Sequence, residues 1–267
     1  MGTATTGTSA AVGVVRSPDG SEIVFERVGS GPVLVVVEGA TGYRASGAGR
    51  GLVPLLAPRC TVVTYDRRGR GDSSDAGPYA VAREVEDLAA VVAAVGGAAT
   101  LYGVSSGALL AARAAADGVP VNRLALFEPP LPEPANAAAD AEFTARISAL
   151  VAQGRRADAL EEFQRAIGVP EEVIAAFAPH RGPAEAVAHT IPYDLAVCLA
   201  TPEDVLRTVT VHTLVLDSAG TDGTLTGSVA RTVAALPRAE HRGLAGRWHQ
   251  VPDADLAPVL AEFVLRG

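Results

Sequence analysis

Gly103-Val104-Ser105-Ser106-Gly107 is the stretch on which the interpretation of the fold depends. It has the pattern G-x-S-x-G and lies between a short predicted strand, residues 100–102, and a predicted helix rich in small residues, 106–117. A serine on a sharp strand-to-helix turn needs glycines beside it, because neighbouring backbone passes too close for a side chain. The following amides lie at a helix N-terminus, where they can stabilise negative charge on oxygen. The pattern therefore predicts that Ser105 is a nucleophile.

The sequence on either side of this turn alternates between β-branched runs and alanine-rich stretches. This alternation is typical of an α/β fold, in which a mostly parallel sheet carries helices on both faces. The first two runs are predicted to pair antiparallel, because Pro18-Asp19-Gly20 between them favours a tight turn. Eight strands are expected, at residues 11–16, 22–28, 33–37, 61–65, 100–102, 121–127, 211–216 and 240–244. Helices are expected at 84–95, 106–117, 231–236 and 256–265.

A long segment between the sixth and seventh runs lacks strand character. Prolines interrupt it at several positions, and its apolar residues recur at helical spacing. We interpret residues 131–209 as a helical lid inserted after strand 6. Residues 12–130 and 210–267 then form the core domain, and residues 1–11, rich in Gly, Thr and Ala, are expected to be a flexible N-terminus.

The composition narrows the classes of function. A length of 267 residues fits one α/β domain, and a net charge of −8 argues against nucleic-acid binding. The chain has no lysine, which excludes a P-loop, a Schiff base and a pyridoxal phosphate site. Cys60 and Cys198 are too far apart for a cysteine metal site, and no histidine has metal-ligand spacing, so we expect no metal and no cofactor.

Partners and location are expected from the same features. No apolar run reaches the roughly 18 residues of a membrane span. We expect a cytoplasmic protein that acts on a small-molecule substrate and binds neither membrane nor nucleic acid. The sequence leaves a homodimer open.

A second motif, Tyr65-Asp66-Arg67-Arg68-Gly69-Arg70-Gly71-Asp72-Ser73-Ser74, identifies a family resemblance. It resembles the turn after the fourth strand in the α/β-hydrolase superfamily, typically Y-D-x-R-G-x-G-x-S, and the resemblance extends over nearly the whole chain. It implies the fold described above and a serine nucleophile at Ser105. Within the turn, two glycines permit the reversal, Asp66 and Arg67 are expected to bond locally, and no residue is expected to be catalytic.

The family carries a G-x-x-H sequence between its last strand and last helix. Gly246-Arg247-Trp248-His249 lies at that place, so His249 is the expected general acid and base for Ser105. His212 and His241 are expected to lie in or beside strands, and His180 and His189 in the lid.

Three carboxylates are candidates for the group that orients His249. Most of the superfamily places its acid after the seventh strand, where Asp217 follows the strand directly and Asp222 comes slightly late. Glu128, at the end of the sixth strand, matches a branch similar to the zearalenone-type lactone hydrolases, which also shares a Ser-Ser-Gly elbow. We favour Glu128 and keep Asp222 and Asp217 as alternatives.

The resemblance also implies an oxyanion hole. Its donors would be the amide of Ser106 and those of Gly39 and Ala40, in the loop after the third strand. Glu38 stands where the family usually has histidine. Two interpretations are open: it braces the loop, or it acts on substrate with a raised pKa. His189 and Tyr193 of the lid are, with Glu38, the expected substrate-binding residues.

These patterns predict a serine esterase or lactonase. The expected reaction cleaves a carboxylic ester or lactone of a small, largely apolar molecule through an acyl-enzyme. One alternative is a non-hydrolytic enzyme of the same fold, such as a cyclase, a lyase or a thioesterase-like protein, with Glu38 in a proton role. Another is a catalytically silent ligand-binding member. The composition, rich in alanine and with arginine in place of all lysine, suggests a bacterial source.

Overall fold

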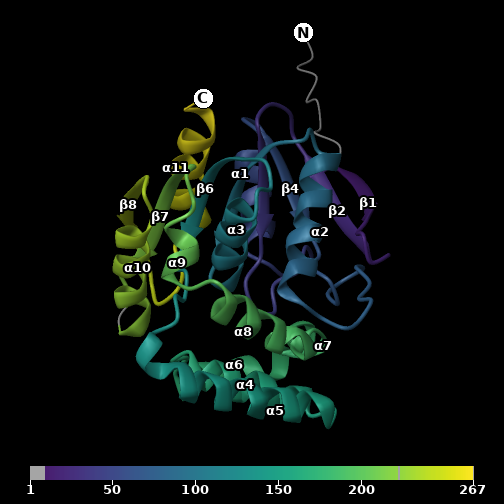
Figure 1. Cartoon of the computed structure of the whole chain (residues 1–267), viewed down its shortest axis with the longest axis vertical. Helices are drawn as coiled ribbons and strands as arrows, with labels where there is room; N and C mark the ends of the chain where they lie inside the picture. Colours follow the sequence, from purple (N-terminus) through teal and green to yellow (C-terminus); the bar gives the residue numbers. More distant parts are fainter. Residues whose placement is uncertain (1–9, 222, 267) are drawn as a thin grey trace.

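An eight-stranded sheet runs through the protein, with helices on both of its faces (Figure 1). The computed structural model describes residues 10–221 and 223–266. The sheet order is β1-β2-β4-β3-β5-β6-β7-β8. β2 pairs antiparallel with β1 and β4, and the other neighbours are parallel, which confirms the predicted fold class. The strands are β1 (Ala11–Arg16), β2 (Glu22–Val28), β3 (Val33–Val37), β4 (Thr61–Tyr65), β5 (Ala99–Val104), β6 (Val121–Phe127), β7 (His212–Ser218) and β8 (Ala239–Leu244).

Each face of the sheet packs on its own set of helices. Successive residues of a strand point to opposite faces, so Val35 and Val37 of β3 join one core cluster while Leu34 and Val36 join another. The first cluster includes side chains of α2, α3 and α10, and the second those of α1 and α11. A strand buried on both faces must be apolar throughout. These helices are α1 (Gly49–Leu56), α2 (Val81–Ala94), α3 (Ser106–Ala116), α10 (Thr224–Ala235) and α11 (Asp253–Leu265).

α2 and α11 each begin three residues before their predicted starts, and two other helices differ more from the sequence prediction. α10 begins at Thr224, well before the expected start at 231. α1 was not predicted, because Gly51 and Pro54 interrupt its helical pattern. It forms because Leu52 and Leu56 are fully buried against the sheet.

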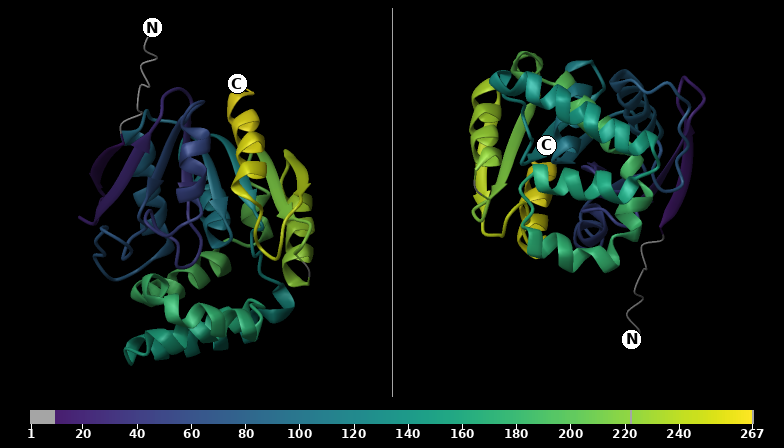
Figure 2. Two further views of the ribbon diagram at one scale, coloured as in Figure 1. Left: turned by 180° about the vertical axis from the view of Figure 1, so that it is seen from behind. Right: turned by 90° about the horizontal axis from the view of Figure 1, so that it is seen from below.

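The segment between β6 and β7 is helical, and most of its helices lie together beyond one end of the sheet (Figures 1 and 2). It has a small core of its own, formed by Ile147, Ala159, Leu160, Ala184, Ala188 and Ile191. Val197, further along α8, instead joins the main core. α8 therefore connects the two cores. The α-helices of this helical insertion are α4 (Ala137–Ala152), α5 (Arg156–Ala166), α6 (Glu171–Phe177), α7 (Gly182–Ala186), α8 (Ile191–Ala200) and α9 (Glu203–Leu206).

The predicted flexible N-terminus, residues 1–11, can be compared with the structure only at its last two residues. Residues 1–9 of the expected flexible segment lie outside the described residues, and Ala11 is already the first residue of β1. Within residues 10–221 and 223–266, no helix combines the length and the apolar character that crossing a lipid bilayer requires.

The first turn of α3 crosses directly over the end of β3. A Cβ at Gly107 would collide with the carbonyl oxygen of Val37 and would lie 2.6 Å from that of Glu38. Both obstacles are backbone atoms, which cannot rotate away. A side chain at Gly107 would therefore push α3 off the sheet.

We expect Gly107→Ala to lower the free energy of unfolding by about 1–3 kcal/mol or more, because the new methyl group overlaps backbone. Urea unfolding followed by circular dichroism measures this. The control is Gly227→Ala in α10, where no atom lies within 4 Å of the added Cβ. That variant should gain about 0.5–1 kcal/mol from helix propensity. Equal stability of the two variants would contradict the close approach.

Candidate active site

The strained backbone of the protein gathers at one group of loops. In the described part of the chain, the residues other than glycine with positive φ are Thr41 (62°), Ser105 (55°), Glu128 (43°) and His249 (51°). They follow β3, β5, β6 and β8, at the carboxyl ends of the strands. A left-handed backbone is costly for residues with a Cβ, and such strain concentrates at functional sites. The backbone therefore marks the same loops as the sequence motifs.

Ser105 lies at the turn between β5 and α3. Its N–H donates to the carbonyl oxygen of Phe127 over 2.9 Å, which joins the turn to the end of β6. A Cβ at Gly103 would lie 2.5 Å from the Cα atom of Ala108, so the chain folds back sharply on both sides of the serine. Ser105 itself is partly buried.

Glu128, which follows β6, contacts His249, which follows β8. Oε2 of Glu128 bonds to Nδ1 of His249, and Oε1 accepts the N–H of Ser218 over 2.8 Å. Glu128 is fully buried. Burial acts to raise the pKa of Glu128, but hydrogen bonds with His249, Thr221 and Ser218 outweigh it and hold the pKa below its ordinary value. The carboxylate is therefore ionised at neutral pH and can accept a hydrogen bond from the N–H at Nδ1 of His249.

The loop after β8 holds His249 in place. Arg247 and Gln250 exchange backbone hydrogen bonds of 2.8 and 3.1 Å, which close the turn that contains the histidine. The N–H of His249 donates to Oγ1 of Thr221 over 2.9 Å. The imidazole ring lies 5.7 Å from the ring of Phe127, centroid to centroid. Because Phe127 also accepts the amide of Ser105, His249 and Ser105 lie at the same edge of the sheet.

The two alternative acids have different positions. Asp217 lies within β7, and its Oδ1 is 3.1 Å from Nε2 of His241 on β8. Asp222 lies outside the described residues. Of the candidates that the structure describes, Glu128 is the one brought against His249.

The predicted oxyanion loop lies directly beside the nucleophile. A Cβ at Gly39 would be 2.8 Å from the carbonyl oxygen of Val104 and 3.1 Å from Cβ of Ser105. Among the described residues, the N–H groups of Gly39, Ala40 and Ser106 have no hydrogen-bond acceptor. Amides without an acceptor, close to a serine, can stabilise negative charge that develops on a bound oxygen.

Glu38 lies beneath this loop and is only 2% exposed. Its Oε2 accepts the N–H of Ala48 over 2.9 Å and its Oε1 that of Gly49 over 2.8 Å, at the start of α1. Burial raises the pKa of Glu38 above its ordinary value, against the opposing effect of the two amides. Both oxygens are thus occupied by backbone, as the bracing interpretation expects.

His189 and Tyr193 lie against the loop after β4. Tyr193 stacks on Tyr79, with ring centroids 3.8 Å apart, and its hydroxyl donates to Asp75 over 2.8 Å. Nε2 of His189 would be 3.4 Å from a Cβ at Gly69. Burial lowers the pKa of His189. Both residues therefore contact this loop, and none of these contacts is with Ser105, Glu128 or His249.

Sequence reasoning missed several residues that shape the site. Ser218 and Thr221 hold Glu128 and His249 but carry no motif. The expectation that Arg67 bonds locally was wrong, because its guanidinium reaches Glu84 and Asp194 instead. Asp194 adjoins Tyr193 in the stretch expected near substrate, but nothing in its sequence context indicates an internal carboxylate.

A nucleophile-type turn between a parallel strand and a helix, on a sheet of this order, defines the class of α/β hydrolases. The family model described as "Alpha/beta hydrolase family" matches residues 34–262, and the chain belongs to that family.

Solved structures show the same relationship. An α/β hydrolase from Sphaerobacter thermophilus is 43% identical, with a TM-score of 0.85 over 94% of this chain and 99% of that one. An esterase from Exiguobacterium antarcticum is 19% identical, with a TM-score of 0.73 over 94% and 98%. An esterase from Rhodococcus is 20% identical, with a TM-score of 0.67 over 96% and 98%. The two esterases establish similarity of fold alone.

We expect Glu38→Gln to lower the free energy of unfolding by about 1–3 kcal/mol, because an amide NH₂ would face one of the two backbone N–H groups. The shape of the pH–rate profile for an ester should not change. Glu22→Gln is the control, since Glu22 pairs with Arg16 on the surface and its loss should cost little. Unchanged stability with loss of one limb of the profile would instead give Glu38 a proton-transfer role.

Proposed function

We propose that the protein is a serine hydrolase that cleaves a carboxylic ester or lactone of a small, largely apolar molecule through an acyl-enzyme. The observation that carries this proposal is the contact of ionised Glu128 with Nδ1 of His249, at the sheet edge that bears Ser105. A carboxylate on Nδ1 fixes the tautomer in which Nε2 can accept a proton. The family membership supports hydrolase chemistry in general.

In the first half of the reaction, Oγ of Ser105 attacks the carbonyl carbon and its proton passes to Nε2 of His249. Glu128 stabilises the imidazolium that results. The imidazolium then protonates the leaving alkoxide as the carbon–oxygen bond breaks, which leaves an acyl group on Ser105. In the second half, His249 takes a proton from water as the oxygen of that water attacks the acyl carbon. The bond between this carbon and Oγ of Ser105 then breaks, the proton passes from His249 to Oγ, and the acid is released. For a lactone, alcohol and acid remain in one molecule.

The negative charge of each tetrahedral intermediate would be held by amides. Ser106 is the first residue of α3, where the helix dipole adds positive potential. Gly39 and Ala40 would supply the other donors from the loop after β3. Removal of one such donor typically costs 10²–10³-fold in kcat, so these amides would contribute a large share of the rate.

The helical insertion is the natural source of substrate selectivity, since it lies at the carboxyl ends of the strands. The non-hydrolytic alternative needed a proton role for Glu38, and both oxygens of Glu38 are bonded to backbone amides. No specific observation therefore favours that alternative.

We expect a fluorophosphonate probe to label wild-type protein at Ser105, because the assembled triad makes this hydroxyl nucleophilic. Mass spectrometry of the labelled peptide identifies the residue. Ser105→Ala should remain unlabelled and should not turn over short p-nitrophenyl esters or aromatic lactones, while Ser148→Ala on α4 should behave as wild type. A wild-type chain that binds apolar ligands but is neither labelled nor active would instead be a silent receptor.

We expect Glu128→Gln to lower kcat on a p-nitrophenyl ester by on the order of 10³–10⁴-fold, because the amide no longer fixes the imidazole tautomer or stabilises the imidazolium. Asp217→Asn and Asp222→Ala are the controls and should stay within about threefold of wild type. If either control lost activity while Glu128→Gln kept it, the acid would be misassigned.

A further inference from the structure

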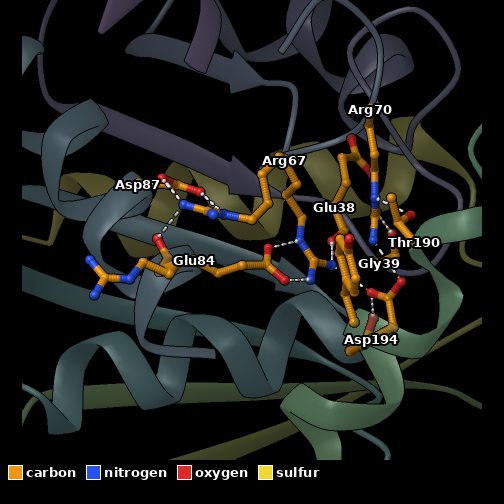
Figure 3. A network of polar contacts seen from close by, with 12 residues as sticks. Glu38, Gly39, Arg67, Arg70, Glu84, Asp87, Thr190 and Asp194 are labelled. Carbon is orange, nitrogen blue, oxygen red and sulfur yellow. Dashed lines mark hydrogen bonds and ion pairs between the residues drawn. The ribbon is translucent and has the colours of Figure 1, made fainter. Parts of the chain in front are cut away.

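A buried cluster of charges lies directly beneath the predicted oxyanion loop (Figure 3). Arg67 and Arg70 are each 1% exposed, and so is Asp194 from α8. Arg67 bonds to both oxygens of Glu84 over 2.7 Å each and to Oδ1 of Asp194 over 2.6 Å. Arg70 bonds to Oδ2 of Asp194 over 2.6 Å and to Oγ1 of Thr190 over 3.0 Å. Two cations and two carboxylates therefore balance one another.

The arginines also hold the backbone of the loop. Arg67 donates to the carbonyl oxygen of Glu38 over 3.1 Å, and Arg70 to that of Gly39 over 2.6 Å. In a planar trans peptide, the carbonyl and the following N–H point in opposite directions. The bond to Glu38 thus turns the N–H of Gly39 away from Arg67, and the bond to Gly39 turns the N–H of Ala40 away from Arg70. Each arginine fixes the direction of one predicted oxyanion donor.

The same loop is fixed at its far side and at the nucleophile. Arg70 also donates to the carbonyl oxygen of Gly42 over 3.1 Å, while the N–H of Gly42 donates to Gly39 over 3.2 Å. This closes a tight turn that places Thr41 at positive φ. On the other side, the hydroxyl of Ser106 donates to Oδ1 of Asp194 over 2.7 Å. Asp194 therefore bonds to the residue that carries the third predicted donor.

We propose that Arg67, Arg70 and Asp194 are positioning residues that aim the oxyanion amides, and that Asp194 makes this geometry depend on helix α8 of the insertion. The inference rests on the proposed function, because it assigns these residues to the transition state of acyl transfer. They act through the backbone of residues 38–42 and through Ser106, and they do not touch the reacting atoms.

A charge cluster in the same turn provides an internal comparison. Arg68 is also fully buried and bonds to both oxygens of Asp87, over 2.7 and 2.8 Å, and to Asp19 over 2.9 Å. None of its contacts is with residues 38–42 or Ser106. Arg68 and Asp87 thus match Arg70 and Asp194 in being a buried arginine–aspartate pair, but not in contact with the loop.

The test compares Arg70→Lys with Arg68→Lys in the full chain. Lysine keeps the charge but cannot reproduce the fork of guanidinium donors, so both variants should lose similar thermal stability. We expect Arg70→Lys to lower kcat on a p-nitrophenyl ester by on the order of 10²-fold with KM within about twofold, because misaimed donors weaken binding of the transition state alone. Arg68→Lys should keep kcat within about threefold of wild type.

An aryl trifluoromethyl ketone gives a second measurement. Ser105 adds to its carbonyl carbon, the serine proton passes to His249, and the ketone oxygen becomes an oxyanion. Its inhibition constant should rise in Arg70→Lys by about the factor lost in kcat, because both report the same donors. In Arg68→Lys the constant should not change.

Asp194→Asn and Asp87→Asn form a second pair if a lysine variant does not fold. The first should show the same loss of kcat and of ketone affinity, and the second should not. Equal losses within a pair, a loss confined to KM, or full activity of the Arg70 and Asp194 variants would overturn the inference while the proposed function stands. A wild-type chain that is neither labelled at Ser105 nor active would overturn both.

Discussion

The crossing of α3 over the end of β3 is the constraint on which the rest of the site depends. No side chain fits at Gly107, because its Cβ would meet the carbonyl oxygens of Val37 and Glu38. The crossing forces Ser105 into a left-handed conformation and brings the loop that begins at Gly39 against it. Packing of backbone on backbone therefore sets the positions of the nucleophile and of the loop, while the direction of the loop's peptide planes depends on the polar groups beneath it.

The buried charges beneath the loop need a different explanation from the apolar core. Moving an ion pair out of water is costly, and well-packed apolar residues often stabilise a protein more than a buried ion pair does. What apolar side chains cannot do is bind carbonyl oxygens. Arg67 and Arg70 bind three carbonyl oxygens between them, on Glu38, Gly39 and Gly42. The cluster therefore determines the direction of the peptide planes in the loop. Its main effect is on the geometry of the loop and not on the stability of the fold.

The parts of the fold and the site that sequence predicts are those encoded locally. Strands buried on both faces are continuous apolar runs, so β3 and β4 were predicted at their observed bounds. α1 was missed because its glycines and proline interrupt the helical pattern, whereas the helix is stabilised by burial of Leu52 and Leu56. Glu128 and His249 were predicted from the places that the family resemblance gives them after strands 6 and 8, and the structure brings them into contact although 121 positions separate them. Arg67 and Asp194 lie 127 positions apart. Their contact was not predicted, because the sequence around a buried charged residue does not distinguish it from an exposed one.

Asp194 limits how the helical insertion can move. A displacement of α8 that separated Asp194 from the two arginines would leave Arg67 its bonds to Glu84 but would leave buried Arg70 without its carboxylate partner. Breaking a buried ion pair in this way typically costs about 3–5 kcal/mol. Such an arrangement would be populated in fewer than about one molecule in a hundred. The helices further out share the small apolar core around Leu160, and their ion pairs, such as Arg165 with Glu171, are more exposed and contribute little. A movement of α4 to α7 therefore separates none of these buried charges, whereas a movement of α8 would separate Asp194 from Arg70, so the buried ion pair favours keeping the helix that bonds to Ser106 in place.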